Sequence, residues 1–374
     1  MPFPAKTPGT PKAQVVVFGS GNFGSCLADH LGDSQHDVYM WSRQAQLVSH
    51  FNLHHRNKSY LKGHVFSTNV KAFGPELPDA DSLRNKDVLL FAVPTQGLRE
   101  FLEKLRPSLN CDNLPLLIFV NKGIEISTHA LTLEIITDTL GADAAKASTF
   151  ISGPSFADEI MRRQPTSVSV ASLSHEKAQA AADIFHKPWF RCYTGNDPIG
   201  LELAGALKNV YAIAAGMSDG LGFENNTRAM LITRGLSEMT CIATAYGASP
   251  LTFLGLAGVG DLFLTCSSPT SRNYTVGLRL GQGEKLPDII NTLGSVAEGV
   301  STAKGVKKII EEMKIDAPIA NEVYSVLHEG HSASDAVQRL LLLPPSRELV
   351  LPKGSGPYAQ RLLRKLGIEE SPKE

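Results

Sequence analysis

Three glycines near the start of the chain, Gly19, Gly21 and Gly24, have the spacing G-x-G-x-x-G. They directly follow an apolar run at residues 15–18 and lead into a helical pattern at residues 25–31. At such a strand-to-helix junction, the first glycine permits a tight turn, the second admits a diphosphate, and the third lets the helix approach the strand. The helix N-terminus then offers N–H groups and a favourable dipole to the anion. We therefore predict a dinucleotide site rather than a purely structural turn, formed by Gly19, Ser20, Gly21, Asn22, Phe23 and Gly24.

The end of the second expected strand bears on which dinucleotide would bind. Enzymes that use NAD usually place an acidic residue there, against the adenosine ribose. In this chain the expected strand at residues 37–41 runs into Ser42 and Arg43 without an acid. Arg43 suits a 2′-phosphate or stacks on adenine, although an ordinary solvated arginine is the alternative interpretation. The choice between NAD and NADP therefore stays open.

Polar or small residues follow three further expected strands, at the edge where open α/β sheets bind ligands. Pro94 follows the strand that begins at residue 87, and Lys122 follows the apolar run that ends at residue 120. Gly153 and Ser155 belong to another turn, and such small residues leave room for a ligand. Lys122 has the reach to contact a substrate oxygen, but a lysine at a strand end is by itself more often only solvated.

A second lysine, Lys208, has the surroundings expected of a catalytic base. It precedes Asn209 in an apolar, helical stretch of small residues. Burial there lowers the pKa of a lysine because desolvation disfavours the charged form, and a nearby Lys122 would act in the same direction. An enzyme that oxidises a secondary alcohol by hydride transfer needs a base for the hydroxyl proton. The alternative is a lysine whose side chain extends to the surface.

Residues farther along the chain have the chemistry to bind a phosphate. Asp261 follows a cluster of glycines, and Thr265 comes shortly after it. The triplet Ser271, Arg272 and Asn273 combines a guanidinium group with short hydroxyl and amide donors, which suits a phosphate. A helix-capping serine beside an exposed arginine is the alternative interpretation of the same triplet.

Two kinds of element must position these residues. Compact apolar runs at residues 14–18, 37–41, 87–93, 115–120 and 149–152 alternate with helical stretches, which predicts an α/β domain with a Rossmann-type doubly wound sheet. From residue 197 to about 341 the pattern is helical, with Asp197 as the cap and Pro198 at the first helical position, which predicts an all-α substrate domain. We expect a loose N-terminal arm at residues 1–13, the dinucleotide-binding domain at 14–195, the helical domain at 196–343 and a C-terminal appendage at 344–374.

Composition narrows the class of protein. The 374 residues carry a formal net charge of −1, which argues against a protein that binds nucleic acid over its whole surface. Five scattered cysteines without a C-x-x-C pair argue against a disulfide scaffold or a zinc site, so no metal is predicted. No apolar run approaches membrane-spanning length, and the proline-rich start lacks a secretory signal. We therefore expect a cytoplasmic protein.

Taken together, the motifs resemble those of NAD(P)-dependent glycerol-3-phosphate dehydrogenases, most closely the bacterial type. They occur in family order over roughly residues 14–340. Asn22 and Phe23 depart from the family's commoner small residue followed by tryptophan. The matching segments are GSGNFG at 19–24, NKGIE at 121–125, SGPSFA at 152–157, GALKN at 205–209, GMSDGLGF at 216–223, TRAMLITRGLSEM at 227–239, GVGDLFLTC at 258–266, SRN at 271–273 and VAEG at 296–299.

The resemblance implies an enzyme that interconverts sn-glycerol 3-phosphate and dihydroxyacetone phosphate, for glycerolipid synthesis or redox balance, with its active site between the two domains. By motif, Lys208 matches the proton acceptor, Lys122 the lysine near the C2 oxygen, and Asp261 the acid beside Lys208. Substrate positions match Lys122, Gly153, Ser155, Lys208, Asn209, Asp261, Thr265, Ser271, Arg272 and Asn273. Cofactor positions match Asn22, Phe23, Arg43, Lys122, Ala157, Arg272, Val296 and Glu298, to which the strand-end Pro94 is added.

Two other functions compete with this interpretation. One is a different two-domain dehydrogenase that acts on a hydroxy acid or a sugar acid. The other is a non-catalytic protein that senses NAD(H), which the complete set of Lys122, Lys208 and Asp261 disfavours because a sensor needs no base. The family also implies a homodimer. Cofactor preference, physiological direction and feedback control are not predicted.

Overall fold

The computed structural model describes residues 12–111, 113–294 and 296–344. The described residues up to Leu342 form one compact unit. The expected C-terminal appendage lies outside the described residues except for its first residue, Pro344. Of the expected N-terminal arm only Lys12 and Ala13 are described, and Lys12 forms an ion pair with Asp37 at 2.8 Å.

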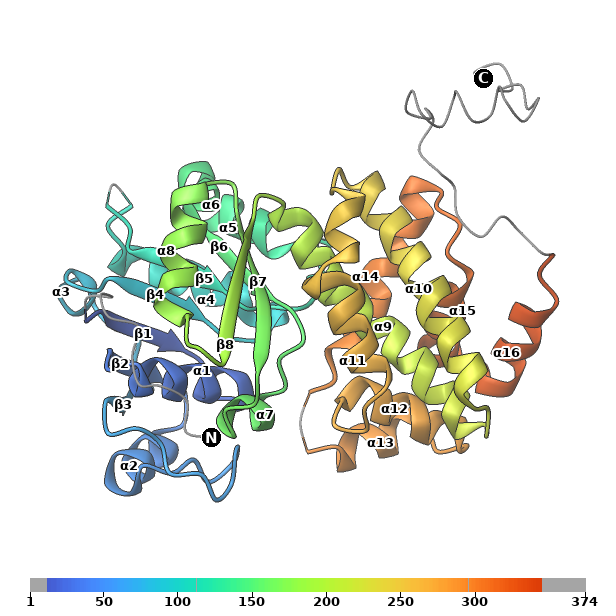
Figure 1. Ribbon diagram of the computed structural model, residues 1–374, viewed down its shortest axis with the longest axis horizontal. Helices are drawn as coiled ribbons and strands as arrows, with labels where there is room; N and C mark the ends of the chain where they lie inside the picture. The colour runs from blue at the N-terminus through green and yellow to red at the C-terminus, as the bar shows by residue number, and fades with distance from the viewer. Residues whose placement is uncertain (1–11, 112, 295, 345–374) are drawn as a thin grey trace, which may run out of the picture. The chain divides into compact units, whose positions relative to one another are not determined.

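The first part of the chain forms one eight-stranded sheet in the order β3-β2-β1-β4-β5-β6-β7-β8 (Figure 1). Neighbouring strands are parallel, except that β6 and β7 pair antiparallel. The five predicted strands are confirmed, and three of them have the predicted bounds. The strands are β1 (Gln14–Phe18), β2 (Asp37–Trp41), β3 (Val70–Phe73), β4 (Val88–Phe91), β5 (Leu116–Phe119), β6 (Thr149–Ser152), β7 (Thr166–Ser172) and β8 (Phe190–Gly195).

Helices cover both faces of this sheet, as the doubly wound prediction requires. Apolar residues of β1 alternate between the two faces. Val15 and Val17 belong to one core cluster, shared with α1 (Asn22–Asp33), α2 (Ala45–His54) and α8 (His175–Phe185). Val16 and Phe18 belong to another, shared with α4 (Leu98–Leu105), α5 (Thr132–Leu140) and α9 (Pro198–Gly220). The second of these cores continues into the helical part of the chain. The helices of the first part are α1 (Asn22–Asp33), α2 (Ala45–His54), α3 (Ala80–Leu83), η1 (Thr95–Gly97), α4 (Leu98–Leu105), η2 (Arg106–Ser108), α5 (Thr132–Leu140), α6 (Ala142–Ala147), α7 (Ala157–Met161) and α8 (His175–Phe185).

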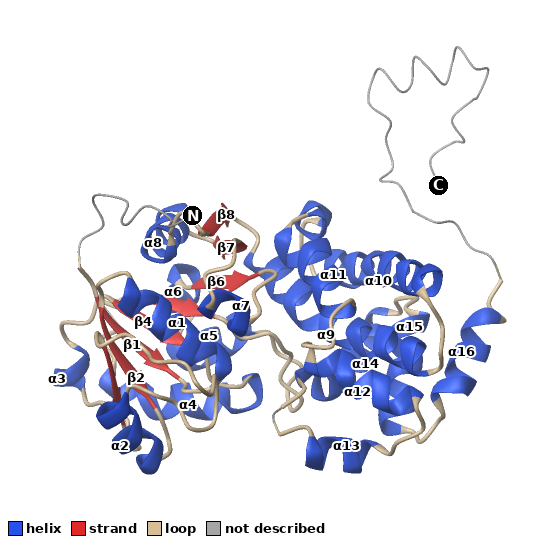
Figure 2. Cartoon of the chain, turned by 60° about the horizontal axis from the view of Figure 1, so that its bottom comes forward, coloured by secondary structure: helices blue, strands red, loops and turns tan. Residues whose placement is uncertain are grey.

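The second part of the described chain is helical throughout, and α9 is its central element (Figure 2). The Asp197 side chain accepts a hydrogen bond from Gly200 N at 2.9 Å and Pro198 opens α9, which confirms the predicted helix start. Helix α9 packs against α10, α11, α12 and α14 and also against β6. The helices are α9 (Pro198–Gly220), α10 (Asn225–Ala245), η3 (Pro250–Leu254), η4 (Leu256–Gly260), α11 (Asp261–Cys266), α12 (Arg272–Gly281), α13 (Leu286–Thr292), α14 (Glu298–Met313), α15 (Pro318–His328) and α16 (Ala333–Leu341).

Among residues 12–111, 113–294 and 296–344, no helix is both long and apolar enough to cross a bilayer.

Candidate active site

The glycine-rich turn between β1 and α1 has the geometry of a phosphate-binding loop. Gly19 has φ = +125°, and a Cβ there would lie 2.6 Å from the carbonyl oxygen of Ala92. A Cβ on Gly24 would lie 2.1 Å from the Gly19 carbonyl oxygen, so α1 approaches the turn closely because these residues lack side chains. A Cβ on Gly21, the residue before α1, would meet no described heavy atom within 4 Å. This open backbone at a helix N-terminus fits the diphosphate of a dinucleotide.

Aromatic and basic residues extend this region beyond the turn. Trp41, at the end of β2, packs edge to face on Phe101 with ring centroids 5.2 Å apart. Its indole Nε1 donates hydrogen bonds to the carbonyl oxygens of Pro75 and Glu76. Arg43, two residues later, is exposed on the cleft wall. An apolar platform beside a guanidinium group suits an adenosine, and a 2′-phosphate would be neutralised there.

One cleft of about 860 Å³ runs from the glycine-rich turn to the helical part of the chain. Every residue predicted to bind cofactor or substrate lines it except Gly153. Gly153 instead contributes its carbonyl oxygen, which accepts a hydrogen bond from Lys122 Nζ at 3.3 Å. The fold therefore brings together residues more than 270 positions apart along the chain, from Gly19 to Glu298, and their individual roles remain predictions.

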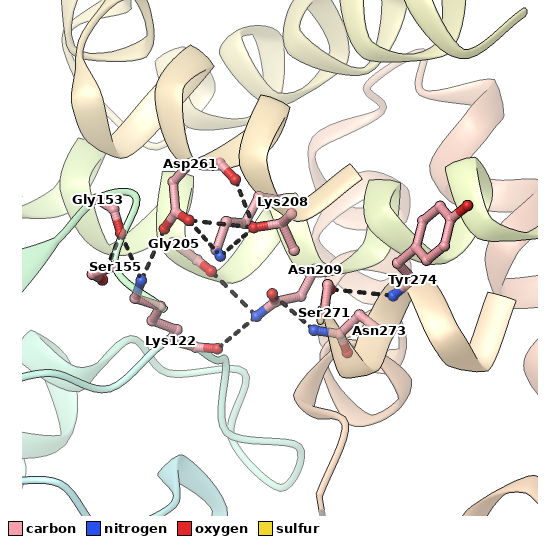
Figure 3. Close-up of polar contacts among 11 residues, drawn as sticks. Lys122, Gly153, Ser155, Gly205, Lys208, Asn209, Asp261, Ser271, Asn273 and Tyr274 are labelled. Carbon is pink, nitrogen blue, oxygen red and sulfur yellow. Dashed lines mark hydrogen bonds and ion pairs between the residues drawn. The ribbon is translucent and has the colours of Figure 1, made fainter. Parts of the chain in front are cut away.

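Two lysines of the cleft, one from each part of the chain, contact one buried carboxylate (Figure 3). Lys208, on α9, places Nζ 2.8 Å from Asp261 Oδ1 and 2.7 Å from Thr265 Oγ1. Lys122, just after β5, places Nζ 2.8 Å from Asp261 Oδ2. Asp261 is 2% exposed and Lys208 is 6% exposed. Asp261 thus fixes the position of both ammonium groups.

Burial and these charges set the protonation of the pair. Burial lowers the pKa of Lys208 to about 8; Asp261 limits the fall, and Lys122 adds to it. Burial by itself would raise the pKa of Asp261, but Lys122 and Lys208 hold that pKa below its usual value. Asp261 therefore stays ionised near neutral pH while Lys208 exchanges a proton there, as a general base requires.

Two asparagines connect this cluster to the triplet at residues 271–273. Asn209 Nδ2 donates to the carbonyl oxygens of Lys122 and Gly205, both at 3.3 Å. Its Oδ1 accepts from Asn273 Nδ2 at 2.9 Å, and Asn273 Oδ1 accepts from Gly299 N at 2.9 Å. This chain of hydrogen bonds joins the end of β5 to α9, α12 and α14, and so spans the cleft.

The start of α12 presents a cation and a helix N-terminus to the cleft. Ser271 caps the helix, with Oγ accepting from Tyr274 N, and Arg272 is exposed on the cleft wall. Glu298, which begins α14, lies within electrostatic range of this arginine and of the two lysines. Burial raises the pKa of Glu298, and Arg272, Lys122 and Lys208 oppose that rise. Arg272 and the N-terminus of α12 together provide a site for a phosphate dianion.

Sequence reasoning did not identify several residues that line the cleft. Trp41 directly precedes Ser42 and Arg43. Its position at the end of the second expected strand could therefore have indicated that it lines the cleft. Tyr60 and Phe101 come from a loop and from α4, in segments without a recognisable motif. Their place in the cleft depends on folding alone.

Comparison with known proteins identifies the family. The family model for the N-terminus of NAD-dependent glycerol-3-phosphate dehydrogenase matches residues 14–179, and that for its C-terminus matches residues 197–338. A glycerol-3-phosphate dehydrogenase [NAD(P)+] of Lawsonia intracellularis is 42% identical over 334 residues, covering 87% of this chain and 93% of the relative. The chain belongs to the NAD-dependent glycerol-3-phosphate dehydrogenase family. The resemblance inferred from the motifs is thereby confirmed.

Further members of this family agree. The glycerol-3-phosphate dehydrogenase [NAD(P)+] of Bacillus pumilus is 40% identical over 336 residues, covering 90% of this chain and 96% of the relative. The crystal structure of glycerol-3-phosphate dehydrogenase from Coxiella burnetii superposes with a TM-score of 0.82 at 33% identity, covering 89% of this chain and 99% of that one. The predicted fold class, a Rossmann-type sheet followed by a helical domain, is that of this glycerol-3-phosphate dehydrogenase.

Proposed function

We propose that this chain interconverts sn-glycerol 3-phosphate and dihydroxyacetone phosphate by hydride transfer with NAD(H) or NADP(H). The observation that carries the proposal is the buried Lys208, held 2.8 Å from Asp261 in the cleft that also contains the glycine-rich turn. Family membership supports the same reaction and disfavours both a different hydroxy-acid dehydrogenase and a non-catalytic NAD(H) sensor.

Lys208 acts as the base for the C2 hydroxyl. An ammonium group has three N–H donors, and among the described residues Asp261 and Thr265 accept two of them. After loss of one proton, the amine keeps these two hydrogen bonds and directs its lone pair along the third tetrahedral direction. A C2 hydroxyl placed there transfers its proton to Lys208 during oxidation, and the ammonium returns the proton during reduction. A bound nicotinamide supplies the hydride acceptor or donor.

Lys122 and Asp261 support this proton transfer. Lys122 reaches the same carboxylate and also the Gly153 carbonyl oxygen, so its ammonium stays beside the C2 oxygen and stabilises negative charge that develops there. Asp261 keeps the two lysines from separating and balances one of their charges. Ser155 Oγ donates a hydrogen bond to the Gly153 carbonyl oxygen at 2.8 Å and so shares this acceptor with Lys122.

Binding of the phosphate fixes the orientation of a substrate with few other polar groups. Arg272, the N-terminus of α12 and the Asn273 amide lie together on the helical side of the cleft. The dinucleotide is held by the turn from Gly19 to Gly24, with Arg43, Pro94, Ala157, Val296 and Glu298 along the rest of the cleft. The proposal includes both NAD and NADP as cofactors, because Arg43 accommodates either.

The proposal extends to the cellular compartment and the oligomeric state of the protein. We place it in the cytoplasm, since the five cysteines are free thiols of the kind a reducing compartment maintains. A homodimer follows from the family resemblance, and light scattering of the purified chain tests it.

One experiment tests the function directly. The purified chain is mixed with dihydroxyacetone phosphate and either NADH or NADPH, and nucleotide oxidation is followed by absorbance. We expect oxidation with at least one cofactor and none when glyceraldehyde or a 2-keto acid replaces the substrate. Absence of oxidation with both cofactors would overturn the proposal, and a preference for a keto acid would favour the other dehydrogenase class.

A further inference from the structure

A buried asparagine outside every predicted site touches the dinucleotide-binding turn from behind. Asn57 lies in the loop that follows α2 and is 2% exposed, whereas its neighbours Arg56 and Lys58 are exposed. A polar amide buried within an otherwise solvated loop is costly unless all its hydrogen bonds are made. The partners of Asn57 therefore show what the residue is for.

The Asn57 amide makes four hydrogen bonds, which is its full capacity. Its Nδ2 donates to the Ser20 carbonyl oxygen at 3.1 Å and to Ser25 Oγ at 3.0 Å. Its Oδ1 accepts from the backbone N–H groups of Ser59 and Tyr60, both at 3.0 Å. The amide has only one orientation that fits, because the reverse would face N–H with N–H and carbonyl with carbonyl.

Ser20 is the residue between the first two glycines of the turn. Its carbonyl belongs to the Ser20–Gly21 peptide, so the direction of this carbonyl sets the orientation of that peptide. Ser25 Oγ also donates to that carbonyl, at 3.0 Å, and Ser25 is completely buried. The Ser20 carbonyl therefore points into the protein, toward Asn57 and Ser25. In a planar trans peptide the N–H points opposite to the C=O. The N–H of Gly21 is thus directed away from the interior, on the side where Ser20 and Gly21 line the cleft.

The same side chain also fixes a second part of the cleft. Tyr60 lines the cleft, and its backbone N–H is one of the two that Asn57 Oδ1 accepts. Asn57 accordingly couples the turn after β1 to the loop after α2, two segments more than thirty positions apart.

We propose that Asn57 is a positioning residue that holds the Ser20–Gly21 peptide with its N–H toward the diphosphate of the dinucleotide. The inference rests on the proposed dinucleotide-dependent function and adds a residue that does not itself contact the cofactor. Asn57 acts through the backbone of the turn, so its loss weakens cofactor binding while the Lys208–Asp261 cluster stays intact.

The test compares Asn57→Asp with Asn52→Asp. Asn52 makes an equivalent pair of hydrogen bonds, with Nδ2 donating to the Ala72 carbonyl oxygen at 2.9 Å and Oδ1 accepting from Ala72 N at 2.8 Å, but it does not line the cleft. In each variant a carboxylate oxygen replaces the NH₂ and faces a carbonyl oxygen. The two changes therefore place the same charge in the same domain, at a buried position for Asn57 and at an exposed position for Asn52.

Dissociation constants of NADH and ADP-ribose are measured by titration, together with kcat, the KM of dihydroxyacetone phosphate and the melting temperature. We expect Asn57→Asp to raise both dissociation constants about tenfold, the effect of losing one well-aligned hydrogen bond to an anion. Two quantities should stay within about twofold of wild type. One is the KM of dihydroxyacetone phosphate at saturating cofactor, and the other is the inhibition constant of adenosine, which lacks the diphosphate. Asn52→Asp leaves all these values within about twofold.

The outcomes separate this inference from the proposed function. If the wild-type chain binds no NADH and reduces no substrate, the proposed function fails. If the wild type is active but Asn57→Asp binds ADP-ribose as tightly as Asn52→Asp does, the positioning role alone is wrong. Should Asn57→Asp not fold, Asn57→Ala decides, since it removes the donor to the Ser20 carbonyl without burying a charge; unchanged ADP-ribose affinity there overturns the inference.

Discussion

The two ends of the cleft are built in different ways. The glycine-rich turn gathers its residues within six consecutive positions and offers backbone groups to the cleft, so its geometry follows from local spacing. The lysine–aspartate cluster joins Lys122 to Asp261, 139 positions apart, and works through buried charges. The contrast shows that a backbone site depends on conformation and absence of side chains, whereas a charged site depends on packing that keeps water out.

The largest effect is expected at the charged end. Lys208→Ala removes the base, and we expect kcat to fall by about 10²- to 10⁴-fold, the usual contribution of a general base. NADH affinity should change little, because the glycine-rich turn is untouched. Stopped-flow turnover and a fluorescence titration of NADH measure the two quantities. Near-normal activity would refute the assigned role of Lys208.

A smaller loss is expected for the phosphate contact. Arg272→Ala removes a guanidinium group from the N-terminus of α12, and we expect the KM of dihydroxyacetone phosphate to rise about 10- to 100-fold. Steady-state kinetics with dihydroxyacetone phosphate provide the measurement, and unphosphorylated dihydroxyacetone provides the control. An unchanged KM for the phosphate would show that the substrate is held elsewhere.

Two glycine-to-alanine substitutions in the glycine-rich turn distinguish its role in folding from its role in cofactor binding. Gly21→Ala adds a Cβ to open space, so the melting temperature should stay near wild type while the dissociation constant of NADH rises about tenfold. Gly24→Ala places its Cβ 2.1 Å from the Gly19 carbonyl oxygen, so it should lower the melting temperature as well. Calorimetry and NADH titration distinguish the two variants. Equal melting temperatures for both would contradict the close contact between α1 and the turn.

The mildest test varies pH, first with the unchanged chain and then with one variant. Because burial lowers the pKa of Lys208 to about 8, oxidation of glycerol 3-phosphate, which needs the neutral amine, should speed up as pH rises through that value. Reduction, which needs the ammonium, should slow over the same interval. Asp261 raises the pKa of Lys208, so Asp261→Asn should move both midpoints to lower pH. Midpoints that move upward instead would contradict this assignment.

Much of the sheet was predictable, and the omissions have physical reasons. Central strands such as β4 and β5 are buried on both faces and appear as continuous apolar runs. Strand β7 alternates serine with apolar residues, and β8 lies at the sheet edge with mostly exposed side chains, so neither forms such a run. The antiparallel pairing of β6 with β7 depends on the path of α7 between them, which no local pattern encodes.

The sequence by itself determined the glycine-rich turn, the central strands, the start of α9 and the family, because each depends on residue types a few positions apart or on motifs in order. Only the tertiary structure decided that Lys208 is buried against Asp261, that Tyr60 and Phe101 line the cleft, and that Asn57 holds the turn from behind. These contacts join segments distant in sequence, and their energies depend on burial. Burial is a property of the folded chain and not of any single segment.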